Sequence, residues 1–481
     1  MMTDLRRTRS RADLAGRRAL VLGLARSGVA AARYLADAGA EVAAYDRRPA
    51  SDLADAVAGL AGRRVRLALG VGEAQARSLV DDADLLLTSP SISTRFPTTD
   101  RWLREALAGA EARGAELVSE VELFLRLTRA RVLGVTGTKG KTTTTSLLGA
   151  IFETAGVAHA VGGNIGQPLI ERVDELDEAS WAILELSELQ LPTITRGADL
   201  AVYTNILADH LDRHGSVEAY RAVKARLAEL SDAAGGEVVL DADDPGCVDL
   251  GARLRGPLHW YGLDGAAILE ATQVGEELWL AGEPLLRVAE VPLPGAHMRR
   301  NVLAAALGAH RAGIAAEAVA RGIREFRGVP HRLETLATRG GVRWVNDSQA
   351  TIPAAAIAGL EAFAPAPVIV IAGGQGKGLE IAVFADAIAA GCRAAVLIGE
   401  TADELERLIG GRVPVARAGS MDEAVAAAAT RARPGDVVLL SPAAASFDMF
   451  ADYAARGDAF RRAVAALPPA DAVLPSDEAA R

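Results

Sequence analysis

The chain has few aromatic residues, few cysteines and no long hydrophobic run. Aromatic side chains make up 4% of its 481 residues, so the cores must be built mainly from Ala, Val, Leu and Ile. Its cysteines, Cys247 and Cys392, lie far apart without metal-ligand spacing, which predicts free thiols in a reducing compartment. The Arg-rich start is followed by a short apolar run that Arg26 interrupts, a pattern typical of neither a secretory signal nor a membrane span. We therefore expect a soluble cytoplasmic protein.

The net charge and the length of the chain limit the kind of protein it can be. The net charge of −10 argues against general binding to nucleic acid, although it leaves room for a local basic pocket that holds phosphates. The length predicts two to four domains, because a single core rarely grows this large. Half of the residues are hydrophobic and glycine is abundant, which favours α/β architecture with many tight turns.

The stretch around which the chain is organised reads RVLGVTGTKGKTTTT and covers residues 131–145. Its start predicts a short buried strand that runs into glycines, after which a helix opens at Lys141. Such a loop presents backbone N–H groups and a helix dipole to phosphate. Lys141 would reach the outer phosphates, and the Thr142 hydroxyl would be a hard ligand for Mg²⁺. The strict phosphate-loop motif has glycine where Val135 stands, so this loop is a variant of the motif. An ordinary Gly-rich turn is the alternative interpretation, but the Gly-Lys-Thr triplet favours nucleotide binding.

The segment before this loop has a Rossmann-like pattern. Residues 17–24 and 41–45 predict strands joined by a helix, and the second strand ends in Asp46, where a ribose hydroxyl is often bound. Ala25 occupies the place of the middle glycine of the dinucleotide fingerprint. NAD is therefore disfavoured, and a nucleotide sugar or a purely structural turn fits better. A third strand at 84–88 runs into a Ser-Pro turn.

Polar residues follow the strands predicted after the phosphate loop. Glu185 ends a strand at 181–186 and is a candidate metal ligand, while His210 follows a strand at 200–203 and is either a metal or catalytic residue or a surface histidine. Asn164, in the loop GGNIGQP, either binds a ligand or only supports the turn. Lys224, on a helix predicted at 218–230, has the pattern of an exposed lysine. Short alternating segments at 260–293 predict a small antiparallel patch, and a helix follows from about residue 297.

A second βα-alternating unit begins near Val329. Strands are predicted at 342–345, 368–372, 394–398 and 437–440, each followed by turn residues and a helical run. One turn carries a glycine run with Lys377, which lacks the Lys-Thr pair of a phosphate loop and suits a carboxylate or phosphate of a bound partner. The tail from Pro468 is rich in Ala, Pro, Asp and Glu and is expected to be disordered.

Taken together, the motifs GVTGTKGKTTT, NILADHLDRH, PHRLE with NDSQAT, and LLSPAAASFDMFADYAARGDAF resemble the Mur ligases of peptidoglycan synthesis across nearly the whole chain. The resemblance implies an α/β protein of three domains: a Rossmann-like N-terminal domain at 1–117, a central P-loop parallel-sheet ATPase domain at 118–328 and a Rossmann-like C-terminal domain at 329–481. It implies an enzyme that uses ATP and Mg²⁺ to add D-glutamate to UDP-N-acetylmuramoyl-L-alanine through an acyl phosphate. It also implies a cytoplasmic monomer that needs neither nucleic acid nor a membrane.

The same resemblance implies a set of site residues. The ATP phosphates would be held by Gly137, Thr138, Lys139, Gly140, Lys141 and Thr142, and the rest of the nucleotide by Asn301, Arg332 and Asp347. Catalytic residues would be Lys141, Glu185, His210 and Lys224, and metal ligands Thr142, Glu185, His210 and a carbamylated Lys224. The UDP substrate would contact Arg26, Ser27, Asp46, Arg48, Asn164, Ser187 and Gln190. The incoming glutamate would contact Thr351, Lys377, Ser446 and Tyr453.

Several positions depart from the family pattern. Ser91 and Met298 replace a usual glycine and asparagine, Glu188-Leu189 replaces a serine and an aromatic residue, and Gln349 replaces a usual lysine. Because these changes affect the amino-acid pocket, a ligase that adds L-glutamate remains an alternative. A non-catalytic nucleotide-binding protein is a second alternative, although it predicts loss of the phosphate and metal residues, which are present. Folylpolyglutamate synthase is disfavoured because it needs no UDP-type first domain, and an NAD-dependent oxidoreductase because no hydride site is visible.

Overall fold

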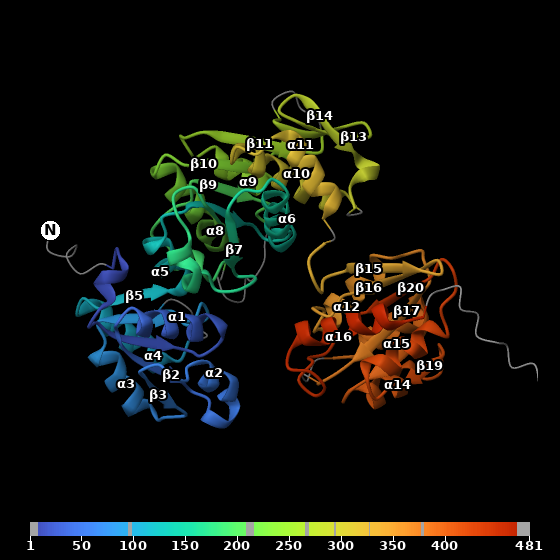
Figure 1. The fold of residues 1–481 in the computed structure, drawn as a ribbon, viewed down its shortest axis with the longest axis horizontal. Coiled ribbons are helices and arrows are strands. Elements are labelled where there is room, and N and C mark those ends of the chain that lie inside the picture. Colours follow the sequence, from blue (N-terminus) through green and yellow to red (C-terminus); the bar gives the residue numbers. More distant parts are fainter. Residues whose placement is uncertain are drawn as a thin grey trace, which may run out of the picture. The chain divides into compact units, whose positions relative to one another are not determined.

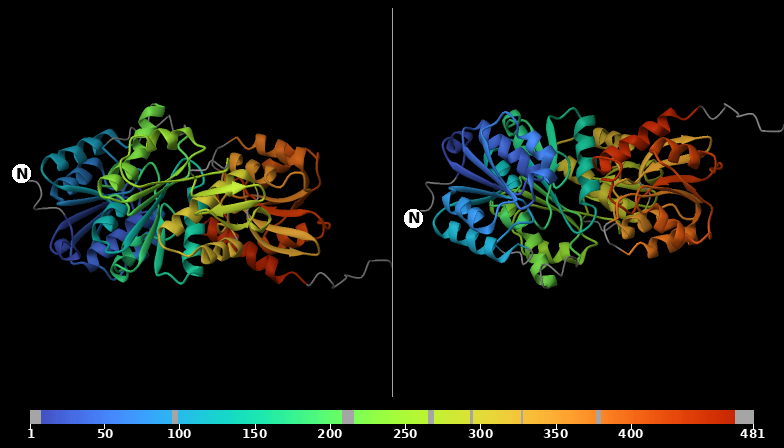
Figure 2. Two further views of the ribbon diagram at one scale, coloured as in Figure 1. Left: turned by 90° about the horizontal axis from the view of Figure 1, so that it is seen from above. Right: turned by 90° about the horizontal axis from the view of Figure 1, so that it is seen from below.

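A computed structural model describes residues 8–94, 99–207, 216–264, 269–292, 295–326, 328–376 and 380–468. The chain divides into two compact units, residues 1–326 and 327–481. The described residues form three β-sheets, two in the first unit and one in the second, with helices along their faces (Figures 1 and 2). None of the described helices is both long and apolar enough to span a membrane.

The first sheet is parallel and has the strand order β3-β2-β1-β4-β5. Its strands are β1 (Arg18–Leu22), β2 (Glu41–Asp46), β3 (Val65–Leu69), β4 (Leu85–Thr88) and β5 (Glu116–Ser119). Its helices are α1 (Arg26–Asp37), α2 (Ala54–Gly59), α3 (Glu73–Asp82), α4 (Arg101–Ala112) and α5 (Glu120–Leu127), with short 3₁₀ turns η1 (Arg11–Leu14) and η2 (Ala50–Leu53). The order reverses between β1 and β4, which is where open α/β sheets bind ligands at the carboxyl ends of the strands.

The turn from β1 to α1 is tight because it uses two glycines. Gly23 has a φ of +94°, which favours glycine, and its N–H donates to the Tyr45 carbonyl. A Cβ on Gly28 would lie 1.9 Å from the Gly23 carbonyl oxygen, so no larger residue fits there. The predicted strand–helix–strand unit is thereby confirmed.

The second sheet has the order β14-β13-β12-β11-β10-β9-β6-β8-β7. Its strands are β6 (Arg131–Thr136), β7 (His159–Gly163), β8 (Trp181–Glu185), β9 (Leu200–Tyr203), β10 (Glu237–Asp241), β11 (Leu258–Gly262), β12 (Ala271–Val274), β13 (Glu277–Leu280) and β14 (Glu283–Arg287). The helices are α6 (Lys141–Thr154), α8 (Val217–Ala233), α9 (Pro245–Gly251), α10 (Ala296–Arg311) and α11 (Ala316–Glu325), with 3₁₀ turns η3 (Leu169–Glu175), η4 (Leu191–Thr193) and η5 (Val288–Glu290). Strands β6 to β12 are parallel, and β13 and β14 add an antiparallel edge, so the predicted antiparallel patch begins later than expected.

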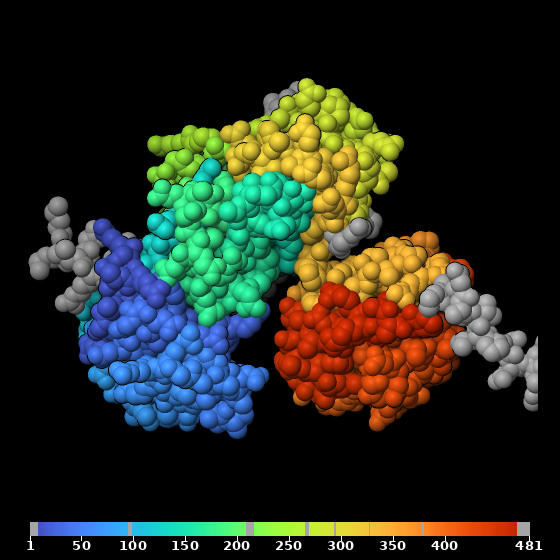
Figure 3. All heavy atoms as spheres, in the orientation of Figure 1, coloured from blue at the N-terminus to red at the C-terminus, as the bar shows by residue number. Residues whose placement is uncertain are grey.

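These two sheets are joined within the first unit by side-chain contacts as well as by the chain. The buried Glu120, at the start of α5, accepts a hydrogen bond of 3.0 Å from the Ile170 N–H at η3. Arg26, at the start of α1, donates one of 3.2 Å to the Gly166 carbonyl in the loop after β7. In the space-filling view the blue and green parts of this unit adjoin (Figure 3). The first-domain turn and the loop GGNIGQP are therefore neighbours.

The second unit contains one sheet of order β15-β16-β20-β17-β18-β19, with only β15 antiparallel. Its strands are β15 (Glu334–Arg339), β16 (Val342–Asn346), β17 (Val368–Gly373), β18 (Cys392–Ile398), β19 (Val415–Arg417) and β20 (Val437–Leu440). Its helices are α12 (Pro353–Glu361), α13 (Ala382–Gly391), α14 (Ala402–Ile409), α15 (Met421–Ala429) and α16 (Tyr453–Ala466). The fully buried strands β17 and β20 explain the continuous apolar runs in the sequence, which parallel sheets covered on both faces require.

Candidate active site

The phosphate loop lies between β6 and α6, as the sequence predicts. Gly140 is the N-cap of α6 with a φ of +88°, and Lys141 is the first helical residue. The Lys141 Nζ donates to the carbonyls of Gly137 and Thr138, at 3.0 and 2.9 Å. The ammonium is thus held within the loop, close to the helix N-terminus that would face a phosphate.

The residues after β9 hold the phosphate loop in place by hydrogen bonds. The Thr204 hydroxyl and the Asn205 amide both donate to the Lys139 carbonyl, at 2.6 and 3.0 Å, and the Lys139 N–H donates to the Asn205 Oδ1 at 2.9 Å. Thr138 shares a hydrogen bond of 3.0 Å with the Tyr220 hydroxyl. These contacts fix the direction of the loop without using its remaining backbone N–H groups.

Asn301, from the early turns of α10, packs against the same loop. It is buried, and a Cβ placed on Gly140 would lie only 2.2 Å from its Oδ1. Asn301, which the sequence predicts to contact the nucleotide, thus reaches the loop from a helix far along the chain, because α10 packs directly on α6.

Glu185 lies directly beside the strand that enters the loop. Its partner in the parallel register of β6 and β8 is Val135, and its side chain is 1% exposed. Its Oε1 accepts a hydrogen bond of 2.7 Å from Asn164, whereas its Oε2 is buried without a hydrogen-bond partner in the described part of the chain. A buried carboxylate oxygen of this kind is costly unless a ligand or cation completes it. Asn164 therefore orients Glu185, which neither of the two sequence interpretations anticipated.

Lys224 is fully buried, so the sequence interpretation of an exposed helix lysine was wrong. The side chain lies on the stripe of α8 that packs on the sheet, together with Tyr220, Leu227, Ala228 and Ser231. Its Nζ is 3.4 Å from the Thr136 hydroxyl at the end of β6 and 5.6 Å from the centre of the Tyr220 ring. The Lys224 ammonium therefore lies where β6 ends and the phosphate loop begins.

Lysine is otherwise almost missing from the chain. Of 52 basic residues only four are lysines, at positions 139, 141, 224 and 377, and all four are residues singled out by the motifs. Everywhere else the sequence uses arginine. Lysine differs from arginine in carrying a compact point charge and in losing its proton more readily when buried. Its restriction to these positions suits a use of the lysine amine, as a compact charge or as a group that can be modified, that arginine would not serve.

The turn of the first domain holds Asp46 in place. Its carboxylate accepts the Leu24 N–H at 2.9 Å and a bidentate pair from Arg48, at 3.0 and 2.9 Å. Burial acts to raise the pKa of Asp46, but the hydrogen bonds from Arg48 and Leu24 outweigh it and lower this pKa to about 2. Arg26 and Ser27 open α1, whose first turn has no acidic residue, so the helix N-terminus stays attractive to an anion. The four predicted residues of this site are brought to one edge of the sheet.

Ser187 and Gln190 lie just after β8 and are bonded to each other. Both the Ser187 N–H and its hydroxyl donate to the Gln190 Oε1 at 3.0 Å, and both residues are buried. The structure thus shows them shaping the loop that follows Glu185.

In the second unit the described residues Asp347, Thr351 and Ser446 follow the carboxyl ends of the neighbouring strands β16 and β20. Asp347 accepts hydrogen bonds from the Ser441 hydroxyl at 2.8 Å and from the Leu333 N–H at 3.2 Å, and burial raises its pKa to about 6. Arg332 is exposed between His331 and Leu333, both of which have a positive φ, of 62° and 47°. Such strained backbone is most often found at functional sites.

The residues expected to bind glutamate are in the same region. Ser446 is buried after β20, Thr351 follows β16, and Tyr453 opens α16 with its ring 6.1 Å from that of His331. Two predicted residues, His210 and Lys377, lie outside the described residues, so the structure does not test them.

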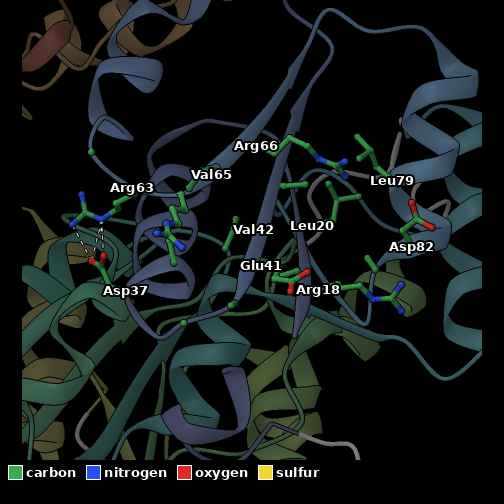
Figure 4. Close-up of a pocket in the computed structure, with 18 residues that line it drawn as sticks. Arg18, Leu20, Asp37, Glu41, Val42, Arg63, Val65, Arg66, Leu79 and Asp82 are labelled. Atoms are coloured by element: carbon green, nitrogen blue, oxygen red, sulfur yellow. Dashed lines mark hydrogen bonds and ion pairs between the residues drawn. The ribbon is translucent and has the colours of Figure 1, made fainter. Parts of the chain in front are cut away.

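A cleft of the first sheet lies in a different place. It has a volume of about 1100 Å³ and lies at the amino ends of β1, β2 and β3, where Arg18, Glu41 and Val65 begin their strands (Figure 4). Its charges are paired in part, with Arg63 bonded to Asp37. Because parallel α/β sheets bind ligands at the opposite, carboxyl edge, we do not assign this cleft to the active site.

The residues present fit Mg²⁺ better than a transition metal. The described residues contain no group of three or more His, Cys, Asp and Glu side chains that could hold a metal ion. They do contain the free Oε2 of Glu185 beside a loop with the Thr142 hydroxyl, and such hard oxygen donors suit a magnesium ion that keeps several waters and contacts phosphate. Parallel sheets, a phosphate loop and this carboxylate define the class of P-loop nucleotide-binding enzymes that activate a substrate with a nucleoside triphosphate.

Comparison with known proteins gives the family. The family model for the Mur ligase middle domain matches residues 135–309, and the model for the Mur ligase, glutamate ligase domain, matches residues 331–444. A UDP-N-acetylmuramoylalanine–D-glutamate ligase of Solibacter usitatus is 40% identical over 95% of this chain and 100% of its own length. Its counterparts from Symbiobacterium thermophilum and Gloeobacter violaceus are 39% and 40% identical, over 94% and 93% of this chain and 98% of each relative. The chain belongs to the Mur ligase family, a family of ATP-dependent ligases.

Solved structures agree with this fold. The chain matches the UDP-N-acetylmuramate-alanine ligase MurC from Thermotoga maritima with a TM-score of 0.56 and 16% identity, over 93% of this chain and 99% of the other. It matches MurF from Acinetobacter baumannii with a TM-score of 0.52 and 14% identity, over 76% and 89%. At these identities the likeness shows the shared fold. The expected α/β class with two Rossmann-like parts and a central P-loop part is thereby confirmed.

Proposed function

We propose that the chain joins D-glutamate to UDP-N-acetylmuramoyl-L-alanine with the hydrolysis of ATP, as a step of peptidoglycan precursor synthesis. The observation that carries this proposal is the buried Glu185 carboxylate beside the phosphate loop, with one oxygen held by Asn164 and the other open. The printed names of relatives that match over nearly the whole chain support the choice of substrates.

The proposed reaction has two steps. An oxygen of the substrate carboxylate attacks the γ-phosphorus of ATP, which forms an acyl phosphate and releases ADP. The amine of glutamate then attacks the acyl carbon, loses a proton and expels inorganic phosphate, which leaves an amide bond. Both steps build negative charge on oxygen atoms, so the site needs cations and directed donors more than it needs a nucleophile.

The predicted site residues have suitable roles in these steps. Lys141 and the N–H groups at the start of α6 bind the phosphates that gain charge, and Asn301 positions the loop. Glu185 and Thr142, with His210, would hold Mg²⁺, which when bound neutralises phosphate charge. Lys139, Gly137, Thr138 and Gly140 complete the loop.

The remaining predicted residues are assigned by domain. We assign the uridine diphosphate to Arg26, Ser27, Asp46 and Arg48, and the muramoyl-alanine arm to Asn164, Ser187 and Gln190. We assign the ATP ribose and phosphates to Arg332 and Asp347, and glutamate to Thr351, Lys377, Ser446 and Tyr453. The corresponding domains are residues 1–117, 118–328 and 329–481, and we place the reaction in the cytoplasm, catalysed by a monomer.

The direct test is phosphate release by the purified chain with ATP, Mg²⁺ and UDP-N-acetylmuramoyl-L-alanine, with either D- or L-glutamate. Release that depends on D-glutamate is the expected result. Release with L-glutamate alone would show that Glu188 and Gln349 mark a pocket of changed specificity. Release with neither amino acid would contradict the proposed function.

A separate measurement addresses Lys224. We propose that its buried amine is carbamylated, because a carbamate would turn a buried cation into an anionic oxygen ligand near the phosphate loop. Incubation with ¹³C-bicarbonate should then give one carbamate NMR signal in the wild type and none in Lys224→Arg, which keeps the charge but cannot form the carbamate. An identical signal in both proteins would rule this modification out.

A further inference from the structure

Arg456 is a charged side chain in the core of the second unit. It lies on α16 and is 1% exposed, on the same stripe of the helix as the buried Phe460, Ala463 and Val464. A guanidinium keeps its charge under all ordinary conditions, so its burial is costly and needs an explanation.

Its hydrogen bonds all go to neutral groups. Nε donates to the Ser348 hydroxyl at 3.0 Å, one terminal nitrogen donates to the Ala444 and Ala445 carbonyls at 3.1 Å, and the other donates to the Ser348 carbonyl at 2.9 Å. Among the described residues no carboxylate forms an ion pair with it. The acid that acts on it electrostatically, Asp448, uses its own carboxylate to accept the Glu400 N–H at 2.9 Å. Burial lowers the pKa of Arg456 to about 10, so the group remains a cation at neutral pH.

The groups that Arg456 binds belong to loops at the carboxyl edge of the sheet. Ser348 follows β16, and Ala444 and Ala445 follow β20, the neighbouring strand. The loop after β17 joins them, because the N–H groups of Gln375 and Ala445 each donate to the other residue's carbonyl, at 2.9 and 3.1 Å. A Cβ on Gly374 would lie 3.1 Å from the Arg456 guanidinium and 2.2 Å from the Ala445 carbonyl oxygen, so this approach requires glycine.

The loops after β16 and β20, and the helix of Arg456 itself, carry described residues assigned to the amino acid. Thr351 follows Ser348, and Ser446 follows Ala445 directly. Tyr453 opens the helix of Arg456, and its carbonyl accepts the Ser348 hydroxyl at 2.7 Å. One buried cation therefore lies behind the residues of the expected pocket and fixes their backbone.

A buried charge that is bonded only to carbonyls and a hydroxyl leaves a positive potential around it. In surroundings of low dielectric constant this potential extends further than it would in water. Neutral partners satisfy the N–H donors but do not cancel the charge, which the more distant carboxylate of Asp448 offsets in part. An anionic ligand at the loop surface would gain from it, whereas a neutral ligand of the same shape would not.

Resting on the proposed function, we propose that Arg456 determines specificity for a dicarboxylic amino acid: it holds the three strand-end loops and supplies part of the positive field that attracts the substrate's side-chain carboxylate. It acts through the loops and through space, so it is a positioning residue.

The test separates charge from structure by three substitutions. Arg456→Lys keeps the charge but not the set of four hydrogen bonds, Arg456→Gln keeps some hydrogen bonding without the charge, and Arg456→Met keeps neither. For each folded variant, the KM for D-glutamate, the KM for ATP and the inhibition constant of D-glutamine are measured in the phosphate-release assay. D-Glutamine has the shape of D-glutamate with one charge fewer.

The expected result is a rise of about tenfold in the KM for D-glutamate in Arg456→Gln, with little change in the KM for ATP or in the inhibition constant of D-glutamine. Arg456→Lys should keep most of the preference for glutamate over glutamine, even where kcat falls. Equal losses for glutamate and glutamine in Arg456→Gln and in Arg456→Lys would show a purely structural role and overturn the proposal. Wild-type protein that fails to turn over D-glutamate would instead contradict the proposed function, before any variant is compared.

Discussion

Helix α6 has a glycine at each end, and replacing them one at a time should separate backbone strain from the fit of the phosphate loop. Gly140, at the N-cap, and Gly156, just after the C-terminus, have φ angles of +88° and +70°. Alanine in the left-handed region costs about 1–2 kcal/mol at either position. Around Gly156 a Cβ would meet no atom within 4 Å, so Gly156→Ala should cost no more than this.

At Gly140 the new Cβ meets a second obstacle. It would lie 2.2 Å from the Asn301 Oδ1, and Asn301 is buried and cannot turn away freely. Forcing extra volume into a packed site costs a further ~1–3 kcal/mol. We therefore expect Gly140→Ala to lose roughly 2–5 kcal/mol of unfolding free energy, and Gly140→Ala/Asn301→Ala to recover part of the loss.

Chemical denaturation of each variant without nucleotide measures these losses, and ATP titration in the phosphate-release assay measures the effect on the loop. A displacement of about 1 Å in a catalytic loop can reduce turnover on the order of a hundredfold, so Gly140→Ala should lose ATP-dependent activity and Gly156→Ala should retain it. Equal destabilisation by both single substitutions, with unchanged turnover, would refute the packing argument and the assignment of Asn301 to this loop.

Three other expectations follow from single residues. Lys141→Ala should lower turnover by about a hundredfold or more, because a charge that meets the phosphoryl oxygens is removed; unchanged turnover would contradict the phosphate-loop assignment. Asp46 has a folded pKa of about 2, below its ordinary value of 3.8, so its contribution is present above pH 4 and is lost as the pH falls toward 2. Asp46→Asn should therefore cost about 2 kcal/mol at neutral pH and much less near pH 2, as measured by urea denaturation. Burial raises the pKa of Glu120 to about 7 from 4.5, which means that this group makes the protein less stable as the pH rises from 4.5 to 7. Glu120→Gln keeps the acceptor for Ile170 and should be relatively more stable above pH 7 but not below pH 4.5; a constant difference across this range would contradict the burial argument.

Much of the fold could be predicted from the sequence because the strands are short apolar runs that end in glycine or polar residues. The strand at 131–136 and the Lys-Thr pair that follows it illustrate this, since both local patterns and the chemistry of the loop point to the same structure. The helix at 296–311 with Asn301 in its early turns was also predicted correctly.

The errors concern charges that lie on the inner stripe of a helix. Lys224 was expected to be exposed, yet it lies three or four positions from buried residues on the packed face of its helix, and the buried Arg456 lies on such a stripe as well. A charged residue on an apolar stripe of a helix was the signal in the sequence that such a charge is buried. The sequence alone does not show which stripe faces the sheet, because tertiary packing determines this. The bond from Asn164 to Glu185 joins two loops 21 residues apart and leaves no trace in a local pattern.

Because lysine occurs at only four positions, chemical labelling of lysine would report on these sites alone. Amine-selective acylation labels lysine and leaves arginine untouched, so a surface with many arginines would contribute no background. Lys139 is exposed on the phosphate loop, whereas Lys224 is enclosed in the core. The extent of labelling at Lys139, read by mass spectrometry with and without nucleotide, would therefore report occupancy of the loop, and delayed labelling at Lys224 would report opening of the core beneath it.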